Sequence, residues 1–191
     1  MSLILGILDS GVTGGGGGGA SYESIATVTV GSGGSASVSF TSIPSTYTHL
    51  QVRGIYKTDF TGTGMTLETY IAFNSDTTSG NYKGHYLYGN GASVQASVST
   101  FQSGIEYGFA PRTGPSNTFS VAVIDILDYQ NTNKYKTIRS LSGGDGNGSG
   151  AVGLWSSVWM NTNAITNITL LPYSSNWTQY SQFALYGIKG A

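Results

Sequence analysis

Short stretches in which apolar and small polar residues alternate constrain the fold of this chain more than any other feature. Between Ser35 and Thr41, for example, Ala36, Val38 and Phe40 alternate with serine. A period of two residues is typical of a β-strand with one buried face, whereas a helix repeats its apolar residues every three or four positions. No segment keeps the helical period long enough to predict a helix, so we expect an all-β protein.

About ten segments fit this pattern, and clusters of glycine, asparagine and serine separate them. The expected strands are residues 25–30, 35–41, 50–57, 67–73, 82–88, 119–127, 135–141, 152–160, 165–171 and 183–188. Short strands at regular spacing are typical of a β-sandwich, here one of the jelly-roll type. Residues 119–127 are nearly apolar on both faces, which predicts a central strand.

Residues 92–115 fit the alternating pattern poorly. One interpretation is an edge strand followed by a long loop, because loops on a rigid sandwich often carry binding residues. The other is a surface excursion without function.

The first twenty residues combine an apolar tip with six consecutive glycines, Gly14–Gly19. Polyglycine forms no stable element by itself because its backbone entropy is the largest of any sequence. We therefore expect an anchor peptide and flexible tether at 1–20 and a β-sandwich domain at 21–191. The predicted docking residues of the tip are Leu3, Ile4, Leu5, Ile7 and Leu8. The alternative is a frayed terminus whose apolar residues fold back on their own domain.

No lysine or arginine precedes Arg53, and the apolar run at residues 3–8 is short. A signal peptide requires a basic segment before its apolar core, and a membrane span requires about 20 apolar residues. We therefore expect neither a signal peptide nor a membrane partner.

Composition excludes several classes of function. Charged residues make up 9% of the chain, with eight Lys and Arg against nine Asp and Glu. No basic stripe can be assembled from so few cations, so we expect no nucleic-acid partner. The absence of cysteine removes disulfides, zinc fingers and thiol catalysis. The two histidines, His49 and His85, lack an accompanying Gly-x-Ser-x-Gly elbow, so we interpret them as packed or surface residues.

Asp125 and Asp128 are the closest acidic pair. At a spacing of three on a strand they point to opposite faces, whereas a glycosidase needs two carboxyl groups that face one glycosidic bond. We therefore expect no catalytic residues, no enzyme activity and no cofactor. The expected partners of the pair are backbone amides, Lys134 or Lys136.

The segment from Asp145 to Gly150 resembles the first half of a calcium-binding loop, with oxygen-bearing side chains at positions one, three and five and glycine at six. The glutamate required at position twelve is absent, because that position is Ser156. We expect a glycine-rich hairpin loop here rather than a metal site.

Among the side chains with binding potential, this chain has Tyr, Trp, Asn, Ser and Thr in quantity. Rigid amphipathic rings suit carbohydrate stacking, but they equally suit a core or a subunit interface, which we consider the better interpretation. The candidates are Tyr82, Tyr86, Tyr88, Trp155, Trp159 and Trp177.

Several whole phrases of the sequence resemble one protein family. They are Ser21-Tyr-Glu-Ser-Ile-Ala-Thr-Val-Thr-Val-Gly31, Ile43-Pro-Ser-Thr-Tyr-Thr-His-Leu-Gln-Val-Arg53, Phe73-Asn-Ser-Asp76, His85-Tyr-Leu-Tyr-Gly-Asn-Gly91, Asp125-Ile-Leu-Asp-Tyr-Gln-Asn-Thr-Asn-Lys134, Leu154-Trp-Ser-Ser-Val-Trp-Met160 and Phe183-Ala-Leu-Tyr-Gly-Ile-Lys-Gly190. These phrases are similar to tailed-bacteriophage virion structural proteins over about residues 21–191. The resemblance implies a place in the virion after assembly in the host cytoplasm, and it implies no catalytic residues.

Within this family we expect a capsid decoration or cement protein, a homotrimer whose N-terminal arm docks on other virion proteins. The alternative is a tail-fibre or baseplate receptor-binding module that holds a host surface glycan through exposed Tyr and Trp. A third class, a glycan hydrolase that depends on Asp125, is the least supported.

Overall fold

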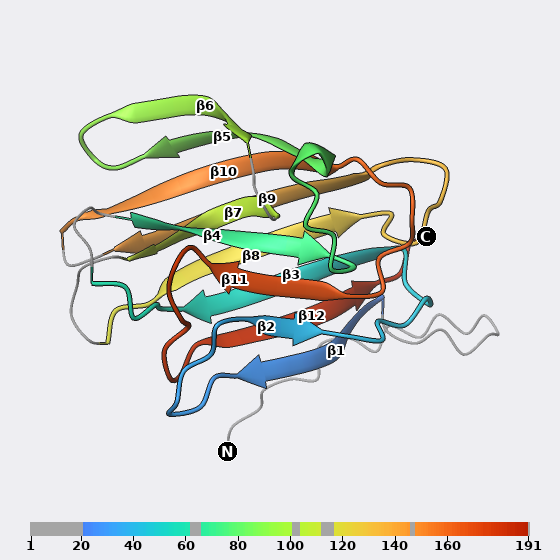
Figure 1. Ribbon diagram of the computed structural model, residues 1–191, viewed down its shortest axis with the longest axis horizontal. Coiled ribbons are helices and arrows are strands. Elements are labelled where there is room, and N and C mark those ends of the chain that lie inside the picture. Colours follow the sequence, from blue (N-terminus) through green and yellow to red (C-terminus); the bar gives the residue numbers. More distant parts are fainter. Residues whose placement is uncertain (1–20, 62–65, 101–103, 112–116, 146–147, 191) are drawn as a thin grey trace, which may run out of the picture.

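The computed structural model describes residues 21–61, 66–100, 104–111, 117–145 and 148–190, and this part of the chain is a β-sandwich without an α-helix (Figure 1). The strands are β1 (Tyr22–Thr29), β2 (Val38–Phe40), β3 (His49–Tyr56), β4 (Thr66–Phe73), β5 (Tyr82–Gly89), β6 (Val94–Thr100), β7 (Ile105–Pro111), β8 (Ser120–Leu127), β9 (Lys136–Asp145), β10 (Gly150–Trp159), β11 (Ile168–Pro172) and β12 (Gln182–Ile188). One short 3-10 helix, η1 (Ser79–Asn81), precedes β5. Within the same ranges, no helix is long and apolar enough to cross a membrane.

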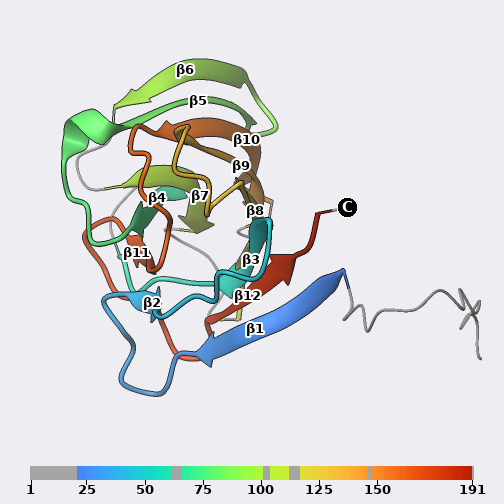
Figure 2. The ribbon, with the colours of Figure 1, turned by 90° about the vertical axis from the view of Figure 1, so that its right-hand side faces the viewer.

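Two antiparallel sheets of unequal width make up the sandwich. The larger has the order β1-β12-β3-β8-β9-β10-β5-β6, and the smaller has the order β2-β11-β4-β7. Figure 2 shows the eight-stranded sheet curling around the four-stranded one, so that β5 and β6 arch over β7. The large sheet therefore has a concave inner face, which packs on the small sheet, and a convex outer face.

Alternation along the strands decides which side chains reach the core. In β8, Ser120, Ala122, Ile124 and Ile126 are buried against the small sheet, and the residues between them point outward. The predicted central position of this strand is confirmed, since β8 is fourth in the sheet of eight. The prediction of an all-β sandwich is confirmed as well.

An aromatic cluster fills the core between the sheets. Tyr56 on β3 stacks on Phe183 of β12 with ring centroids 5.6 Å apart, and Trp177 meets the two rings at 5.3 and 5.1 Å. All three side chains are almost completely buried. The Trp177 indole N–H donates to the Leu170 carbonyl of β11 at 3.2 Å, so this residue links the two sheets.

The described residues contain two more strands than the ten that the sequence pattern indicates, and both lie in residues 92–115. The predicted edge strand is β6, which ends the large sheet. The predicted long loop is wrong from residue 104 onward, because residues 105–111 form β7. Residues 105–110 are all buried, since the core covers one face and the β5–β6 arch covers the other. A strand buried on both faces has no alternation to detect.

Lys136 is the one charged side chain with no exposed surface among the described residues. Its ammonium group donates to the carbonyls of Asn131 at 2.6 Å, Thr162 at 3.0 Å and Lys134 at 3.2 Å. Three carbonyl acceptors match the three donors of an ammonium group. The side chain therefore joins the turn before β9 to the loop after β10, and burial lowers its pKa.

We predict that Lys136→Met lowers the free energy of unfolding by about 2–4 kcal/mol, because three carbonyls lose their partner. Urea unfolding followed by circular dichroism measures this change. Lys134→Met is the matched control: its side chain is 55% exposed and pairs with Asp128, so the loss should stay below about 1 kcal/mol. Equal losses in the two variants would contradict this role of Lys136.

Asp76 organises the turn between β4 and β5. Its carboxylate accepts hydrogen bonds from the Thr78 amide at 2.9 Å and from the Asn81 side chain and the Trp159 indole at 2.8 Å each. Burial by itself would raise the pKa of Asp76, but these donors outweigh it and lower the pKa to about 2. The carboxylate thereby satisfies the indole N–H of a tryptophan that is fully buried.

Because the folded-state pKa of Asp76 is depressed, its contribution to stability is complete above about pH 4 and is lost as pH falls towards 2. We expect the wild-type protein to lose about 1–2 kcal/mol from this group over that interval. In Asp76→Asn this part of the acid dependence should disappear, as measured by urea unfolding at pH 2 to 6. Asp145→Asn, at the exposed end of β9, should retain it.

Candidate functional site

The outer face of the large sheet carries most of the exposed large apolar side chains of the described residues. Eight of them point outward from β3, β5, β6, β8, β9 and β10, each between 46% and 74% exposed: Ile55, Leu87, Val94, Val98, Val121, Leu141, Val152 and Leu154. Neighbouring strands bring these residues next to each other. Soluble monomers rarely expose a continuous apolar surface of this kind unless it binds a partner.

The strand register arranges this surface in rows. The first outer row crosses six strands as Ile55, Val121, Gly143, Val152, Gly89 and Val94. The second outer row lies two residues further along the strands and contains Val123, Leu141, Leu154, Leu87 and Ala96. From Val121 to Val94, valine and glycine alternate along the first outer row, so raised positions alternate with recesses.

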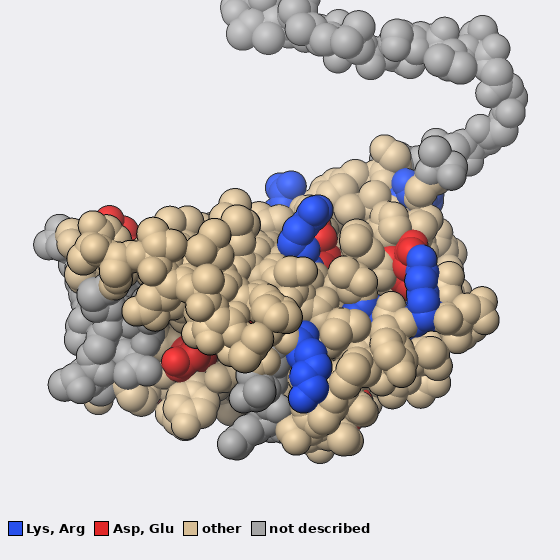
Figure 3. Space-filling model, turned by 90° about the horizontal axis from the view of Figure 1, so that it is seen from above, with Lys and Arg blue, Asp and Glu red and all other residues tan. Residues whose placement is uncertain are grey.

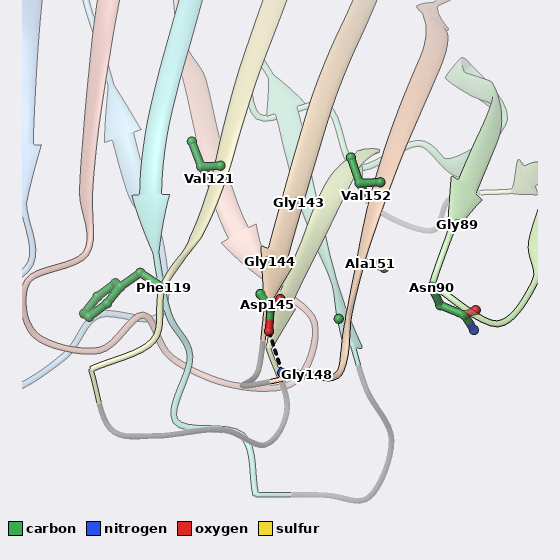
Figure 4. A pocket seen from close by; sticks show the side chains of 12 residues that line it. Gly89, Asn90, Phe119, Val121, Gly143, Gly144, Asp145, Gly148, Ala151 and Val152 are labelled. Atoms are coloured by element: carbon green, nitrogen blue, oxygen red, sulfur yellow. Dashed lines mark hydrogen bonds between the residues drawn. The ribbon is translucent and has the colours of Figure 1, made fainter.

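A hollow of about 530 Å³ lies over the glycines of the first outer row. Figure 4 shows Val121 and Val152 on either side of Gly143, with Asn90 and Phe119 further out. This hollow is lined mainly by glycine and apolar side chains and is therefore suited to apolar groups.

A second hollow, of about 360 Å³, lies beside the second outer row. Leu87 and Leu154 line this hollow, and Arg139 and His85 are its charged or titratable lining residues. The outer face thus combines an apolar surface with a cation.

Charged residues are sparse on this face. Asp125 accepts from the Gln51 amide at 2.8 Å and contacts the Arg139 guanidinium at 3.5 Å. Arg53 lies over the rings of Tyr22 and Tyr186, 5.5 Å from each centroid. Figure 3, which views the molecule from the β5–β6 side, shows a few charged side chains, some of them next to each other, within a mostly uncharged surface. A surface of this composition resembles the centre of a protein interface, where charges are depleted.

Most of the aromatic residues proposed as glycan contacts do not reach the surface. Tyr82, Trp155, Trp159 and Trp177 are at most 2% exposed, so the glycan interpretation is wrong for them and the core interpretation holds. Tyr86 and Tyr88 are half-buried on the inner face of β5, with ring centroids 5.8 Å apart. Of the six candidates, only these two tyrosines present rings that a ligand could contact.

The β5–β6 arch encloses a second, smaller core that the sequence did not indicate. Phe109 of β7 meets Trp155 and Tyr88 edge to face, with centroids 5.0 and 5.1 Å apart. Glu106, also on β7, is 5% exposed and accepts a hydrogen bond from the Ser99 hydroxyl of β6 at 2.9 Å. Burial raises the pKa of Glu106 to about 7, and the nearby Glu68 adds to this shift.

The structure places the two residues of the acidic pair, Asp125 and Asp128, in different settings. Asp125 points outward from β8, whereas Asp128 lies beyond the end of that strand at a φ of 48°. The predicted ion pair between Asp128 and Lys134 is confirmed. The predicted contact with Lys136 is wrong, because that ammonium group binds backbone carbonyls. His49 accepts a hydrogen bond from the Asp128 backbone amide at 2.9 Å, a structural contact.

The calcium-like loop is described only in part, since residues 146–147 lie outside the described ranges. The Asp145 carboxylate accepts a hydrogen bond from the Gly148 amide at 2.9 Å, as the dashed line in Figure 4 shows. In the described part of the chain, no three His, Asp or Glu side chains are grouped as metal ligands. The predicted docking residues Leu3, Ile4, Leu5, Ile7 and Leu8 also lie outside the described residues.

Comparison of the chain with protein-family models, with curated proteins and with solved structures gave no match.

The buried Glu106 makes stability depend on pH. Because its folded-state pKa is raised, the folded protein keeps a proton that the unfolded chain releases near pH 4.5, so stability falls as pH rises towards 7. We predict that Glu106→Gln removes a decline of about 2–3 kcal/mol between pH 4.5 and 8. Urea unfolding at pH 4, 6 and 8 tests this. The control Glu23→Gln, on β1, should keep the decline; if Glu106→Gln keeps it too, the assignment fails.

Proposed function

We propose that this chain is a non-enzymatic structural protein of a tailed-bacteriophage virion, a capsid decoration protein that binds other protein subunits. The observation that carries the proposal is the apolar outer face, which spans six strands with few charges. Burial of apolar area contributes roughly 25 cal/mol per Å², so a modest contact repeated around a particle adds up.

Two further observations support a binding role rather than a catalytic one. The phrases from Ser21 to Gly190 resemble virion structural proteins, for which no catalytic residues are expected. The two ionisable groups closest to a catalytic pattern, Asp125 and Asp128, are occupied by Gln51, Arg139 and Lys134. The sequence adds an apolar tip, residues 3–8, as a second docking element, and a homotrimer is the proposed assembly.

The receptor-binding alternative rests on Tyr86 and Tyr88. Their adjacent, half-buried rings are the arrangement on which a sugar ring can stack. Tyr88 also donates a hydrogen bond to Gln95 at 2.6 Å, which fixes its ring beside β6.

Particles that lack the protein, mixed with purified variants, test the proposal. We expect Leu154→Asp to weaken attachment at least about tenfold, because a charge is placed in the apolar face. Removal of residues 1–19 should leave a domain with unchanged circular dichroism that no longer attaches. Occupancy on the particle, measured by cryo-electron microscopy or quantitative gels, is the readout. Tyr180→Asp, at a residue 70% exposed outside the outer rows, is the control and should attach normally.

Full attachment of the truncated protein would contradict the anchor, and full attachment of Leu154→Asp would contradict the role of the outer face. Binding of host polysaccharide that is lost in Tyr86→Ala and Tyr88→Ala, with intact particles, would instead establish the receptor-binding alternative.

A further inference from the structure

The outer face needs an occupant that fits a convex surface. Figure 2 shows the large sheet curving away on its β10–β5–β6 side, so that an identical face could touch it over only part of its width. A single extended segment can follow the curvature. It would lie in the hollows over Gly143 and beside Leu154.

The chain contains a segment of matching chemistry. Residues 3–8 read Leu-Ile-Leu-Gly-Ile-Leu and contain no polar side chain, and Asp9 is the sole charged side chain before Glu23. Along β9, the outer face has groups that would match this segment in the same order. Gly143 in the first outer row and Leu141 in the second would face the apolar residues, and Arg139 in the next row would face Asp9. Asp145, at the far end of β9, would repel Asp9 and therefore favours one orientation.

The length of the intervening chain agrees with this placement. Ser21, where the described chain begins beside β1, follows Asp9 by twelve positions, with eleven residues between them. A glycine-rich chain of this length has an r.m.s. span of about 19 Å. β1 and β9 are four strand positions apart, which corresponds to about 19 Å at roughly 4.8 Å per strand. A linker whose span matches the distance between two sites gives the highest effective concentration for binding within one molecule.

We propose that residues 3–9 of the free protein lie on the outer face of their own domain. Leucine and isoleucine side chains occupy the apolar rows over β9 and β10, and the Asp9 carboxylate pairs with the Arg139 guanidinium. The inference goes beyond the proposed function, because it concerns the unassembled chain and holds whether or not the protein is a virion component.

Paramagnetic relaxation tests the contact in the full chain. The protein has no cysteine, so Ser2→Cys accepts a single nitroxide label. In dilute labelled protein we expect the amide signals of Val121, Gly143 and Val152 to lose intensity. The amides of Tyr70 and Tyr173, on the outside of the small sheet, should keep theirs. Intensity should return in Leu154→Ser and in Asp9→Asn, both of which weaken the contact, and should remain low in the control Tyr180→Ser.

A mixture of ¹⁵N-labelled protein without nitroxide and unlabelled protein with nitroxide separates the two possible geometries. Contact within one molecule predicts no loss of signal in this mixture. Loss of signal in the mixture would show that the tip binds a second copy, and full intensity in every sample would show that it does not bind the face; either result overturns the proposal.

Discussion

A four-stranded sheet is too narrow to cover a flat eight-stranded one, and the shape of this protein follows from that mismatch. The large sheet curls until its inner face closes on the small sheet, and the β5–β6 arch passes over β7. The aromatic cluster of Tyr56, Trp177 and Phe183 holds the centre of this arrangement. The arch adds the smaller core around Phe109 and Trp155, where the Glu106 carboxyl is separated from water. Curling also makes the outer face convex, and this determines what can bind there.

The apolar side chains of the outer face are not accounted for by the stability of the fold. A leucine or valine that points outward contributes nothing to the core, and eight such residues in adjacent strands expose a continuous surface that water solvates poorly. Some polar groups of the same face are engaged with each other, as in the contacts of Asp125 with Gln51 and Arg139. A glycan would need hydrogen-bonding groups directed at its hydroxyls, and the two outer rows offer few of these. The physical chemistry of the face therefore favours a protein segment or a protein surface as its partner.

Period-two alternation identified the fold class because it is a direct consequence of strand geometry, and it placed β8 at the centre of its sheet. It failed for β7, since a strand covered on both faces has no polar side to alternate with. The alternation pattern also does not reveal which face of a strand is covered by a neighbouring element. For that reason the two-sided apolar pattern of β8 was interpreted as burial, although Val121 is 51% exposed. The burial of Trp155 and the position of Glu106 depend on the arch of β5 and β6 over β7, which is a contact between strands that the alternation within a single strand does not record. Composition could name the aromatic candidates but could not separate Tyr86 and Tyr88 from the buried rings.

The proposed contact of the tip with its own face and the proposed attachment to a particle are thermodynamically coupled. If residues 3–9 occupy the outer face in the free chain, neither the tip nor the face is available until they separate. The apparent affinity for the particle is then the intrinsic affinity reduced by the fraction of molecules in the open state. Separation exposes two apolar surfaces at once, so a partner that binds both recovers more free energy than one that binds either alone. Such coupling would keep free copies of the protein from associating through their apolar surfaces. Association would then occur only at sites on the particle that bind the tip and the outer face at the same time. Weakening the Asp9–Arg139 pair should therefore strengthen attachment to the particle, whereas removing the tip's leucines should weaken it.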